Sequence, residues 1–310
     1  HSPGETHNGD VGITGAALLA FLGAGHTDKV GKYKDNVKRG MAWLIKDLGD
    51  KTRFGNARAS NYSQGVAAMA MSEAAGMNPR NQEYRKAAQQ AVDGVTAGQI
   101  KDGLSEYQAW DYLPGGVTND TSVTGWNILA LKSAKISGLR VEVASLEGAM
   151  RWINAAQDLT NAPKDGDADY WEGGLVSYRG TLQAPTGRWI SVTAIGAATR
   201  LFVGGEKPSH PGVSGPCNLM KKELPNKGND LYYWYYGTLT IFQKGGEHWD
   251  IWNKEMKKYL LEKQRKDAAF DGSFDPSICF NGVKIGGRVF STAMGALCLE
   301  VYYRYLPLYR

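Results

Sequence analysis

The chain has little of what disulfide frameworks, metal centres and membrane segments require. Its 310 residues include three cysteines, which lie far apart without a CxxC pair, so no disulfide framework is expected. None of the five histidines stands at a zinc-ligand spacing from a cysteine, and we predict neither a metal nor another cofactor. No apolar run is long enough for a transmembrane helix, so the sequence predicts no membrane-spanning segment.

Charge is also sparse and mixed in sign. Lysines and arginines number 36 and acidic residues 31, and the basic residues are scattered rather than gathered in a stripe. This distribution argues against a nucleic-acid partner. Aromatic residues, in contrast, are plentiful, with 9 Trp, 16 Tyr and 8 Phe, which indicates that something large and partly polar is lined or packed by rings.

An internal repeat organises the sequence. Six small residues each open an apolar stretch with little polar face, which predicts helices buried nearly all round. These anchor residues are Gly15, Gly65, Gly125, Ala194, Gly237 and Ala293.

More polar segments with helical periodicity lie between the anchors. In the first of them Val37, Met41, Leu44 and Leu48 follow a 4-3-4 spacing, and segments 143–153 and 249–259 follow 3-4-3 spacings. Such spacings predict amphipathic helices with one buried face. No alternation of apolar and polar residues is long enough to indicate a sheet.

Buried helices that alternate with amphipathic ones along the whole chain predict an all-α fold of the α/α toroid type. We expect a double ring of about six inner and five or six outer helices, with parallel inner helices whose N-terminal ends meet at one mouth of a central cavity. Residues 1–310 are predicted to form a single domain. Because the chain begins at His1 rather than Met, we expect part of a longer or processed protein.

Two segments carry a family resemblance. Residues 152–157 (WINAAQ) and 259–264 (YLLEKQ) fit the aromatic–aliphatic–xxx–Gln core of the QW repeat of squalene cyclases, and 271–274 (DGSF) is similar to the close of that repeat. The first repeat departs, with Leu48 where Gln would stand. The chain therefore resembles the prenyltransferase and squalene-oxidase repeat superfamily of α/α toroids, most closely its bacterial members of unassigned function. This resemblance is compatible with a secreted or envelope-associated bacterial protein, although the sequence leaves the compartment open.

The resemblance implies an acid at the head of an inner helix, where squalene cyclases carry DxDDTA and protonate their substrate. Here Asn119 occupies the place of the proton donor and Val117 that of the first acid. Since an amide cannot protonate an alkene, we expect no terpene cyclisation. Asp120 survives from the motif, and Asp10 stands at the same offset in its own repeat, a recurrence that favours helix caps over catalytic acids.

The residues before the anchors form the candidate site. If the inner helices are parallel, they gather hydroxyls, acids, an Arg and aromatic rings at one cavity mouth, which suits a sugar or a peptide better than a terpene. The candidate acid and base groups are Asp10, Asp120 and Tyr236, and the candidate ligand-binding residues are Gln64, Trp126, Trp189, Tyr232, Tyr235 and Arg288.

Three functions remain open on this evidence. The leading prediction is binding of a small-molecule or glycan ligand, or of a protein partner, at this polar and aromatic mouth. The first alternative is an enzyme, either a lyase or hydrolase acting on a glycan or an isoprenoid-processing enzyme, that uses the acids and Tyr236. The second alternative is a purely structural module whose outer ring meets protein partners.

Overall fold

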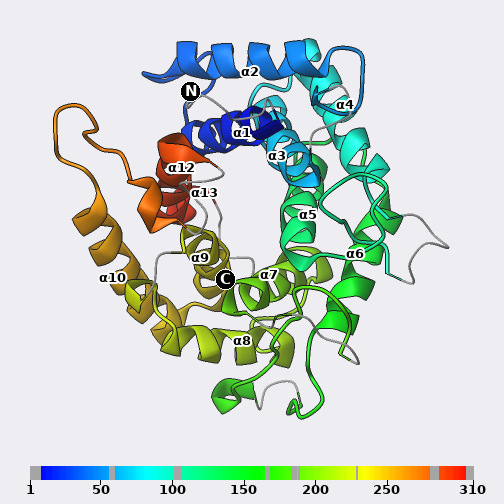
Figure 1. Cartoon of the computed structure of the whole chain (residues 1–310), viewed down its shortest axis with the longest axis vertical. Helices are drawn as coiled ribbons and strands as arrows, with labels where there is room; N and C mark the ends of the chain where they lie inside the picture. Colours follow the sequence, from blue (N-terminus) through cyan, green and yellow to red (C-terminus); the bar gives the residue numbers. More distant parts are fainter. Residues whose placement is uncertain are drawn as a thin grey trace. The chain divides into compact units, whose positions relative to one another are not determined.

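The computed structural model describes residues 8–55, 60–100, 107–164, 168–182, 187, 189–227, 230–279 and 286–304. Within these ranges the regular elements are helices, and extended pairing is limited to two isolated bridges, so the all-α prediction is confirmed (Figure 1). The contacts divide the chain into two compact units, His1–Trp152 and Ile153–Arg310, called the N-terminal and C-terminal units below. A single domain over 1–310 stays a prediction.

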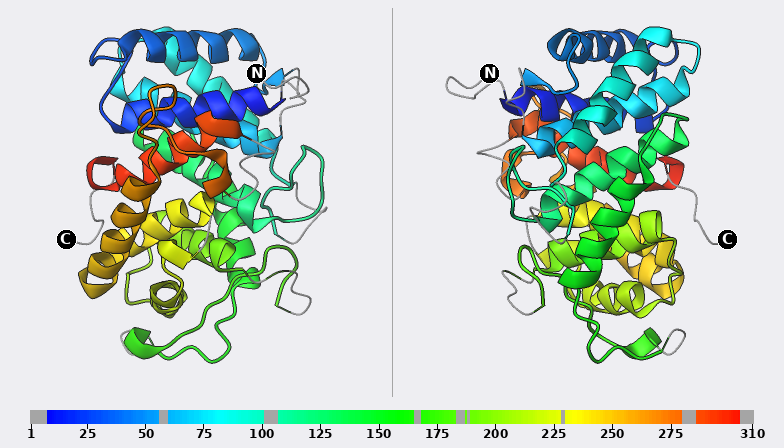
Figure 2. Two further views of the ribbon diagram at one scale, coloured as in Figure 1. Left: turned by 60° about the vertical axis from the view of Figure 1, so that its left-hand side comes forward. Right: turned by 90° about the vertical axis from the view of Figure 1, so that its right-hand side faces the viewer.

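The N-terminal unit alternates buried and amphipathic helices. The buried helices are α1 (Asn8–Gly23), α3 (Asn61–Met77) and α5 (Thr121–Ile136). The amphipathic helices are α2 (Lys34–Leu48), α4 (Gln82–Ala97) and α6 (Val143–Ala156), whose last turn enters the C-terminal unit. Helix α3 packs against both α1 and α5, while α2 lies against α1 and α4 against α3 (Figure 2).

The three buried helices run parallel. At the N-terminal end of α3, Tyr62 donates a hydrogen bond to Ser122 near the start of α5, and Ser133 donates one to Glu73 (3.3 Å) near the other end. Between α1 and α3 the backbones approach closely, because a Cβ added at Gly15 would lie 2.9 Å from the backbone of Ala67. Glycine at this anchor therefore permits the helices to touch, and their N-terminal ends lie on one side of the unit.

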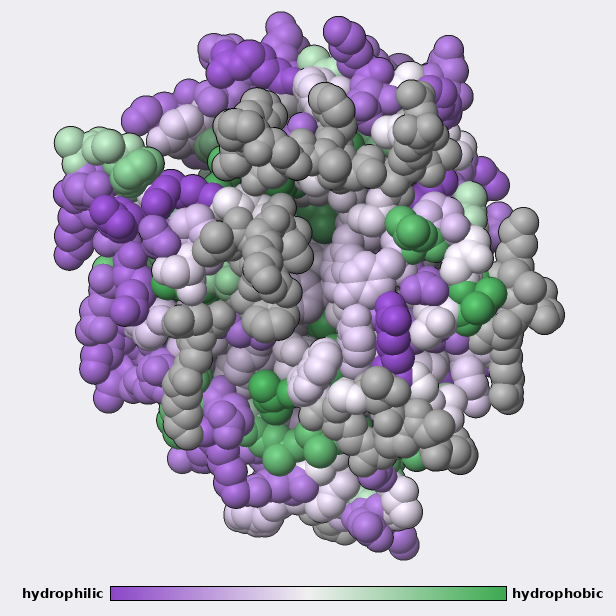
Figure 3. Space-filling model, viewed as in Figure 1, coloured by the Kyte–Doolittle hydropathy of each residue, from purple (hydrophilic) through white to green (hydrophobic). Residues whose placement is uncertain are grey.

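The predicted face of α2 is confirmed. Its buried residues are Val37, Met41, Leu44 and Leu48, the four that the spacing selects. The opposite side is hydrophilic, as Figure 3 shows for the surface over this helix. In α6 the predicted spacing is wrong at its start, because Val143 is 60% exposed as the first residue of the helix, ahead of the turns that bury Leu146 and Ile153.

The C-terminal unit repeats the alternation with shorter helices. Its buried helices are α7 (Ile190–Thr199), which continues as the π-helical turn η3 (Arg200–Gly204), α9 (Leu231–Lys244) and α12 (Gly287–Leu299). Its outer helices are α8 (Pro211–Lys222) and α10 (Gly246–Lys263). The short elements are η2 (Ala168–Tyr170), η4 (Pro225–Lys227), η5 (Pro276–Ile278) and α13 (Val301–Arg304).

Hydrogen bonds and ring contacts fix the directions of these helices. Lys244, the last residue of α9, reaches Pro208 (3.3 Å) in the turn between η3 and α8, so α7 and α9 end on the same side. Tyr302 in α13, just after α12, has its ring centroid 6.2 Å from that of Phe242 near the end of α9. Helices α7, α9 and α12 are therefore parallel, and their N-terminal ends share one side of this unit.

One tie between loop and inner helix recurs in both units. Directly before an anchor, a side-chain oxygen accepts a hydrogen bond from the backbone N–H of a buried residue in the preceding loop. The four pairs, acceptor first, are Gln64 with Phe54 (3.3 Å), Thr124 with Trp110 (3.3 Å), Thr193 with Val176 (3.1 Å) and Thr292 with Phe274 (3.1 Å). These oxygens satisfy backbone donors that the loops would otherwise bury without a partner.

The glutamines of the QW-like segments have an equally local role. Gln157 directly follows α6 and donates to the carbonyl of Gly174 (2.9 Å), and Gln264 directly follows α10 and donates to the carbonyl of Gly272 (2.9 Å). Each also forms the isolated bridge of its repeat. An amide that fastens the returning loop to the outer helix is useful to any double ring of helices, so the motif specifies architecture rather than a family.

Candidate functional site

Asp120 lies at the N-terminal end of α5 and is fully buried. Its Oδ1 accepts hydrogen bonds from the backbone N–H groups of Ser122 (2.9 Å) and Val123 (3.1 Å). It is therefore the N-cap residue, and the helix-cap interpretation of Asp120 is confirmed. The neighbouring Asn119 accepts a hydrogen bond from the backbone of Ala109 (2.9 Å), so this amide holds a loop in place.

Asp10 differs from Asp120 in its position on the helix. It lies within the first turn of α1 and is half-buried, whereas Asp120 stands before the first turn of α5. Both α1 and α5 pack against α3. The two acids that the repeat pairs in sequence therefore belong to helices on either side of a third.

The sequence prediction missed a chain of hydroxyl groups next to Asp120. Ser122 donates to Asp120 Oδ1 (2.6 Å), and Tyr62 on α3 donates to Ser122. The ring of Tyr62 is tilted against that of Tyr112, with centroids 5.4 Å apart, and Tyr112 is 38% exposed. The packing of α3 on α5 brings Tyr62 to Ser122, and the loop before α5 brings Tyr112, whereas the motif NDTS marks no more than the Asp and Ser.

Two predicted ligand-binding residues of this unit are buried in the core. Gln64 donates to the backbone carbonyls of Thr52 (3.1 Å) and Ala91 (2.8 Å), besides accepting from Phe54, so its amide serves the backbone. Trp126 is 1% exposed inside α5. Both side chains are thus enclosed by the unit's own residues, and their contact with a ligand stays a prediction.

In the C-terminal unit the sequence prediction missed Asp230. It is the N-cap residue of α9, and its Oδ1 accepts from the backbone N–H groups of Tyr232 and Tyr233, both at 3.1 Å. Burial raises the pKa of this carboxyl group to about 6, against the opposing effect of those two hydrogen bonds. The signal available in the sequence was an Asp directly before the apolar run LYYWYYG.

The predicted tyrosines follow Asp230 on α9. Tyr235 and Tyr236 are each 1% exposed, with ring centroids 5.2 Å apart, whereas Tyr232 is half-buried and lies 5.3 Å from Tyr236. Tyr232 is thus the member of this predicted set that solvent reaches. Tyr236, the predicted acid or base, belongs to the packed interior of the unit.

Trp189 is the N-cap residue of α7, and Arg288 is the second residue of α12. Trp189 is 56% exposed, and its ring lies 4.9 Å from that of Tyr178. Arg288 donates to Asp275 (2.9 Å) and lies over the ring of Phe270 (4.2 Å). Trp189 therefore offers an open ring surface, while the charge of Arg288 is matched by an acid of its own unit.

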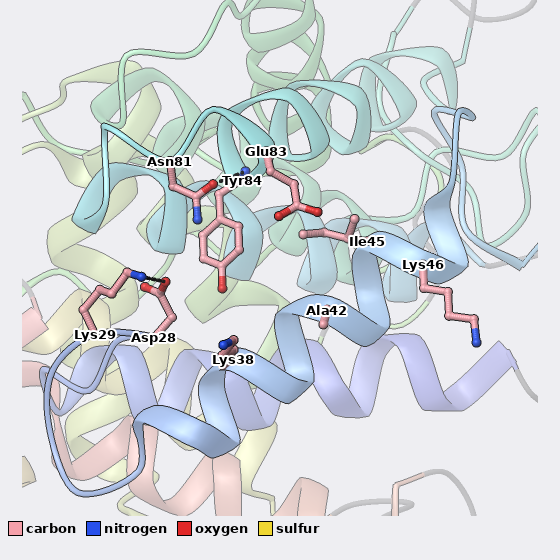
Figure 4. A pocket seen from close by; sticks show the side chains of 9 residues that line it. All are labelled: Asp28, Lys29, Lys38, Ala42, Ile45, Lys46, Asn81, Glu83 and Tyr84. Carbon is pink, nitrogen blue, oxygen red and sulfur yellow. Dashed lines mark hydrogen bonds and ion pairs between the residues drawn. The ribbon is translucent and has the colours of Figure 1, made fainter.

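Two grooves in the described part of the surface lie apart from all these residues. One of about 430 Å³ lies between α2 and α4, where Tyr84 and Lys38 approach each other from the two helices (Figure 4). It also includes Asp28, in the turn after α1, so it lies toward the C-terminal ends of the buried helices. A second groove of about 170 Å³ is lined by Asp158 and by the loop at 171–175. Neither contains a predicted site residue.

Across the ranges that the structure describes, no cluster of three His, Cys, Asp or Glu side chains could hold a metal ion. In the same part of the chain, no helix combines the length and the apolar character that crossing a membrane needs.

The chain was then compared with known proteins. No family model and no curated protein matches the sequence. Solved structures do match. The α-1,6-mannanase of glycoside hydrolase family 76 from Salegentibacter sp. is 10% identical, with a TM-score of 0.63 over 98% of this chain and 90% of that one. A sugar epimerase from a ruminal bacterium is 12% identical, with a TM-score of 0.62 over 96% and 88%. Cellobiose 2-epimerase from Bacillus thermoamylovorans is 12% identical, with a TM-score of 0.60 over 94% and 87%.

These likenesses bear on fold, because identities near 10% do not carry function. They correct the resemblance to the prenyltransferase and squalene-oxidase repeat superfamily, since the matching toroids are glycoside hydrolases and sugar epimerases. The QW-like segments misled because their glutamines fasten loops, a need that all such folds share. The predicted fold class is confirmed: the chain has the α/α toroid fold.

Proposed function

We propose that this protein is an enzyme of the hydrolase or lyase class that acts on a glycan, with Asp230 as its general acid. The proposal is supported by the structures that share its fold, which include an α-1,6-mannanase and two sugar epimerases. It replaces binding without catalysis as the leading function and keeps the glycan as the ligand. Isoprenoid processing has no support among these structures.

The environment of Asp230 carries the proposal. A general acid must hold its proton near the working pH, and a pKa of about 6 meets that need, as an unperturbed carboxyl group would not. Both backbone hydrogen bonds go to Oδ1. Oδ2 is therefore the oxygen that would carry the proton to a glycosidic oxygen.

The C-terminal unit carries aromatic side chains near the N-terminal ends of α7 and α9, and such rings can pack against a sugar. Tyr232, two residues after Asp230, is half-buried, and the exposed ring of Trp189 stands at the start of α7. Sugar rings present C–H faces that pack on aromatic rings and hydroxyl groups that need hydrogen-bond partners. An acid among such rings is suited to cleavage of a glycosidic bond.

The experiment is a conversion assay with α-1,6-mannotetraose, cellotetraose and maltotetraose, called the tetrasaccharide set below. New reducing ends would indicate hydrolysis, and new absorbance from an unsaturated sugar would indicate elimination. Asp230→Asn keeps the capping oxygen and removes the transferable proton, so we expect turnover to fall about 10²- to 10⁴-fold with binding retained. Glu223 is an exposed acidic residue, so Glu223→Gln serves as the control and should leave turnover unchanged. Full activity in Asp230→Asn would contradict the assignment.

Non-catalytic glycan binding is the second candidate, and the sequence itself supports it. A variant of the Salegentibacter mannanase with two adjacent aspartates replaced is inactive. This chain has no two adjacent acidic residues, and at 119–120 and 229–230 an Asn precedes the Asp. Glycoside hydrolysis ordinarily uses two carboxyl groups. Tight binding of a tetrasaccharide without any conversion would favour this candidate.

A further inference from the structure

The groove between α2 and α4 in the N-terminal unit has a buried polar side chain in its wall. Tyr84 is 5% exposed, and its phenol group points across the groove toward Lys38 on α2 (Figure 4). Within the described part of the chain, the hydroxyl group of Tyr84 has no hydrogen-bond partner. Because buried hydroxyl groups usually have a partner, one that faces a groove without a partner indicates a place for a ligand atom.

The surroundings of Tyr84 keep its phenol group protonated. Burial, together with the negative charges of Asp28 and Glu83, raises the pKa of Tyr84 to about 12. The phenol therefore keeps its proton at neutral pH and can donate it in a hydrogen bond. Asn81 adds a second donor. Its Oδ1 accepts from the backbone N–H of Tyr84 (3.1 Å), so the N–H groups of the amide are left to face the groove (Figure 4).

The charged side chains around the groove leave one positive charge in excess. They are three lysines and two acids, namely Lys29, Lys38, Lys46, Asp28 and Glu83. Asp28 is already matched, since its carboxylate accepts from the amide of Asn78 (3.2 Å) and lies 3.9 Å from Lys29. Lys38, which faces Tyr84, forms no ion pair with an acid in the described part of the chain. An unmatched ammonium group therefore lies beside two neutral donors.

The groove has room for a small ligand. Lys38, Ala42 and Lys46 follow one another at intervals of about one helical turn along α2, so the short side chain of Ala42 leaves a hollow between the two lysines. The half-buried Ile45 adds an apolar contact. The volume of about 430 Å³ is in the range of small-molecule sites. A ligand the size of a small sugar is compatible with this space.

We propose that this groove binds a small monocarboxylate that also carries hydroxyl groups, such as a sugar acid. Lys38, Tyr84 and Asn81 hold the carboxylate through hydrogen bonds that its charge strengthens. Glu83 accepts hydrogen bonds from the ligand's hydroxyl groups. One unmatched positive charge suits one negative charge, so the groove favours a sugar acid over a neutral or an amino sugar. The inference goes beyond the proposed function and does not depend on it, because the groove belongs to the N-terminal unit and Asp230 to the C-terminal unit.

The test is calorimetric binding of glucuronate, glucose and glucosamine. We expect glucuronate to bind, and the other two sugars to bind about tenfold more weakly or not at all. Tyr84→Phe keeps the ring and removes the donor, and Lys38→Met removes the charge, so each should raise the dissociation constant for glucuronate about tenfold. Lys86→Met, at an exposed position of α4 that does not line the groove, is the control and should leave binding unchanged. Near-ultraviolet circular dichroism checks that each variant is folded.

Ionic strength provides a second measurement. Salt screens the attraction between an anion and an exposed lysine, so glucuronate should bind more weakly as salt is added, and Lys38→Met should lose most of this dependence. Equal affinity for glucuronate in Lys38→Met, in Tyr84→Phe and in the unmodified protein would overturn the site. Absence of glucuronate binding, or tighter binding of glucosamine, would also overturn it. None of these results bears on Asp230, whose test is turnover of the tetrasaccharide set.

Discussion

Asp120 and Asp230 do the same work for the backbone in different surroundings. Each caps a buried helix by accepting two backbone hydrogen bonds, at 2.9 and 3.1 Å for Asp120 and at 3.1 Å twice for Asp230. Asp120 also accepts a hydrogen bond from the hydroxyl group of Ser122. Asp230 is followed by Leu231 and a run of aromatic residues, and burial raises its pKa to about 6.

This difference shows what a recurring Asp does and does not indicate. Capping depends on the chain's own N–H groups, so it can be read from position in the repeat. Chemical reactivity depends on which hydroxyls, rings and charges the fold places around the carboxyl group. The acid that the repeat singled out is the one tied into a hydrogen-bond chain, and the acid that it overlooked has the raised pKa.

The largest expected effect would come from Asp230→Asn. The folded pKa of about 6 lies above the value of 3.8 for an unperturbed carboxyl group, so the folded protein holds this proton more tightly. The stabilisation from the protonated group is complete below pH 3.8 and is lost as pH rises through about 6. The shift corresponds to at most about 3 kcal/mol, at about 1.36 kcal/mol for each pH unit. Asn is neutral throughout, so the variant should unfold at higher temperature than the unmodified protein at pH 8 and at a similar temperature at pH 4.

Thermal unfolding at the two pH values measures this effect. The exposed Glu223→Gln should show no such gain at pH 8. A loss of stability in Asp230→Asn at pH 8 would break the comparison, because it would mean that the carboxylate of Asp230 is as well satisfied as that of Asp120.

The hydrogen bonds from loop N–H groups to the side chains before the anchors occur in both units. Their loss should have an intermediate effect on the free energy of unfolding. Thr193→Val removes the oxygen that accepts from Val176 and leaves that buried N–H without its bond, at a cost of about 1–3 kcal/mol. Thr124→Val, in the other unit, should cost a similar amount through Trp110. Urea unfolding compares both with the exposed Thr160→Val, which should change little. If only one of the two buried variants is destabilised, the tie is not a common feature of the repeats.

Asp120 should give the smallest effects. Asp120→Asn keeps the accepting oxygen and should cost a few tenths of a kcal/mol, whereas Asp120→Ala loses the cap and should cost about 1 kcal/mol. Thermal unfolding of the two variants measures which of them is less stable. A rise in stability for Asp120→Asn, like that expected for Asp230→Asn, would show that Asp120 is strained as an ionised group and that its role goes beyond capping.

Some of the site could be predicted from the sequence and some could not. Some helix starts follow from short patterns, and Asp120 and Trp189 stand at the N-cap positions of their helices as the repeat implies. Tyr232 and Arg288 stand five residues before their anchors, as Asp120 does, but the N-cap residues are Asp230 for α9 and Gly286 for α12. A fixed offset from one anchor residue fails where a helix begins one half-turn earlier.

The sequence by itself determined the alternation of buried and amphipathic helices, because side-chain periodicity of 3.6 residues and small residues at the anchors act locally. It also determined that Asp120 caps its helix. The contact of Tyr62 with Ser122, 60 residues apart, and the burial that raises the pKa of Asp230 arose only from packing between helices. Such contacts leave no local pattern, since hydrogen bonding and desolvation depend on what lies nearby in space rather than along the chain.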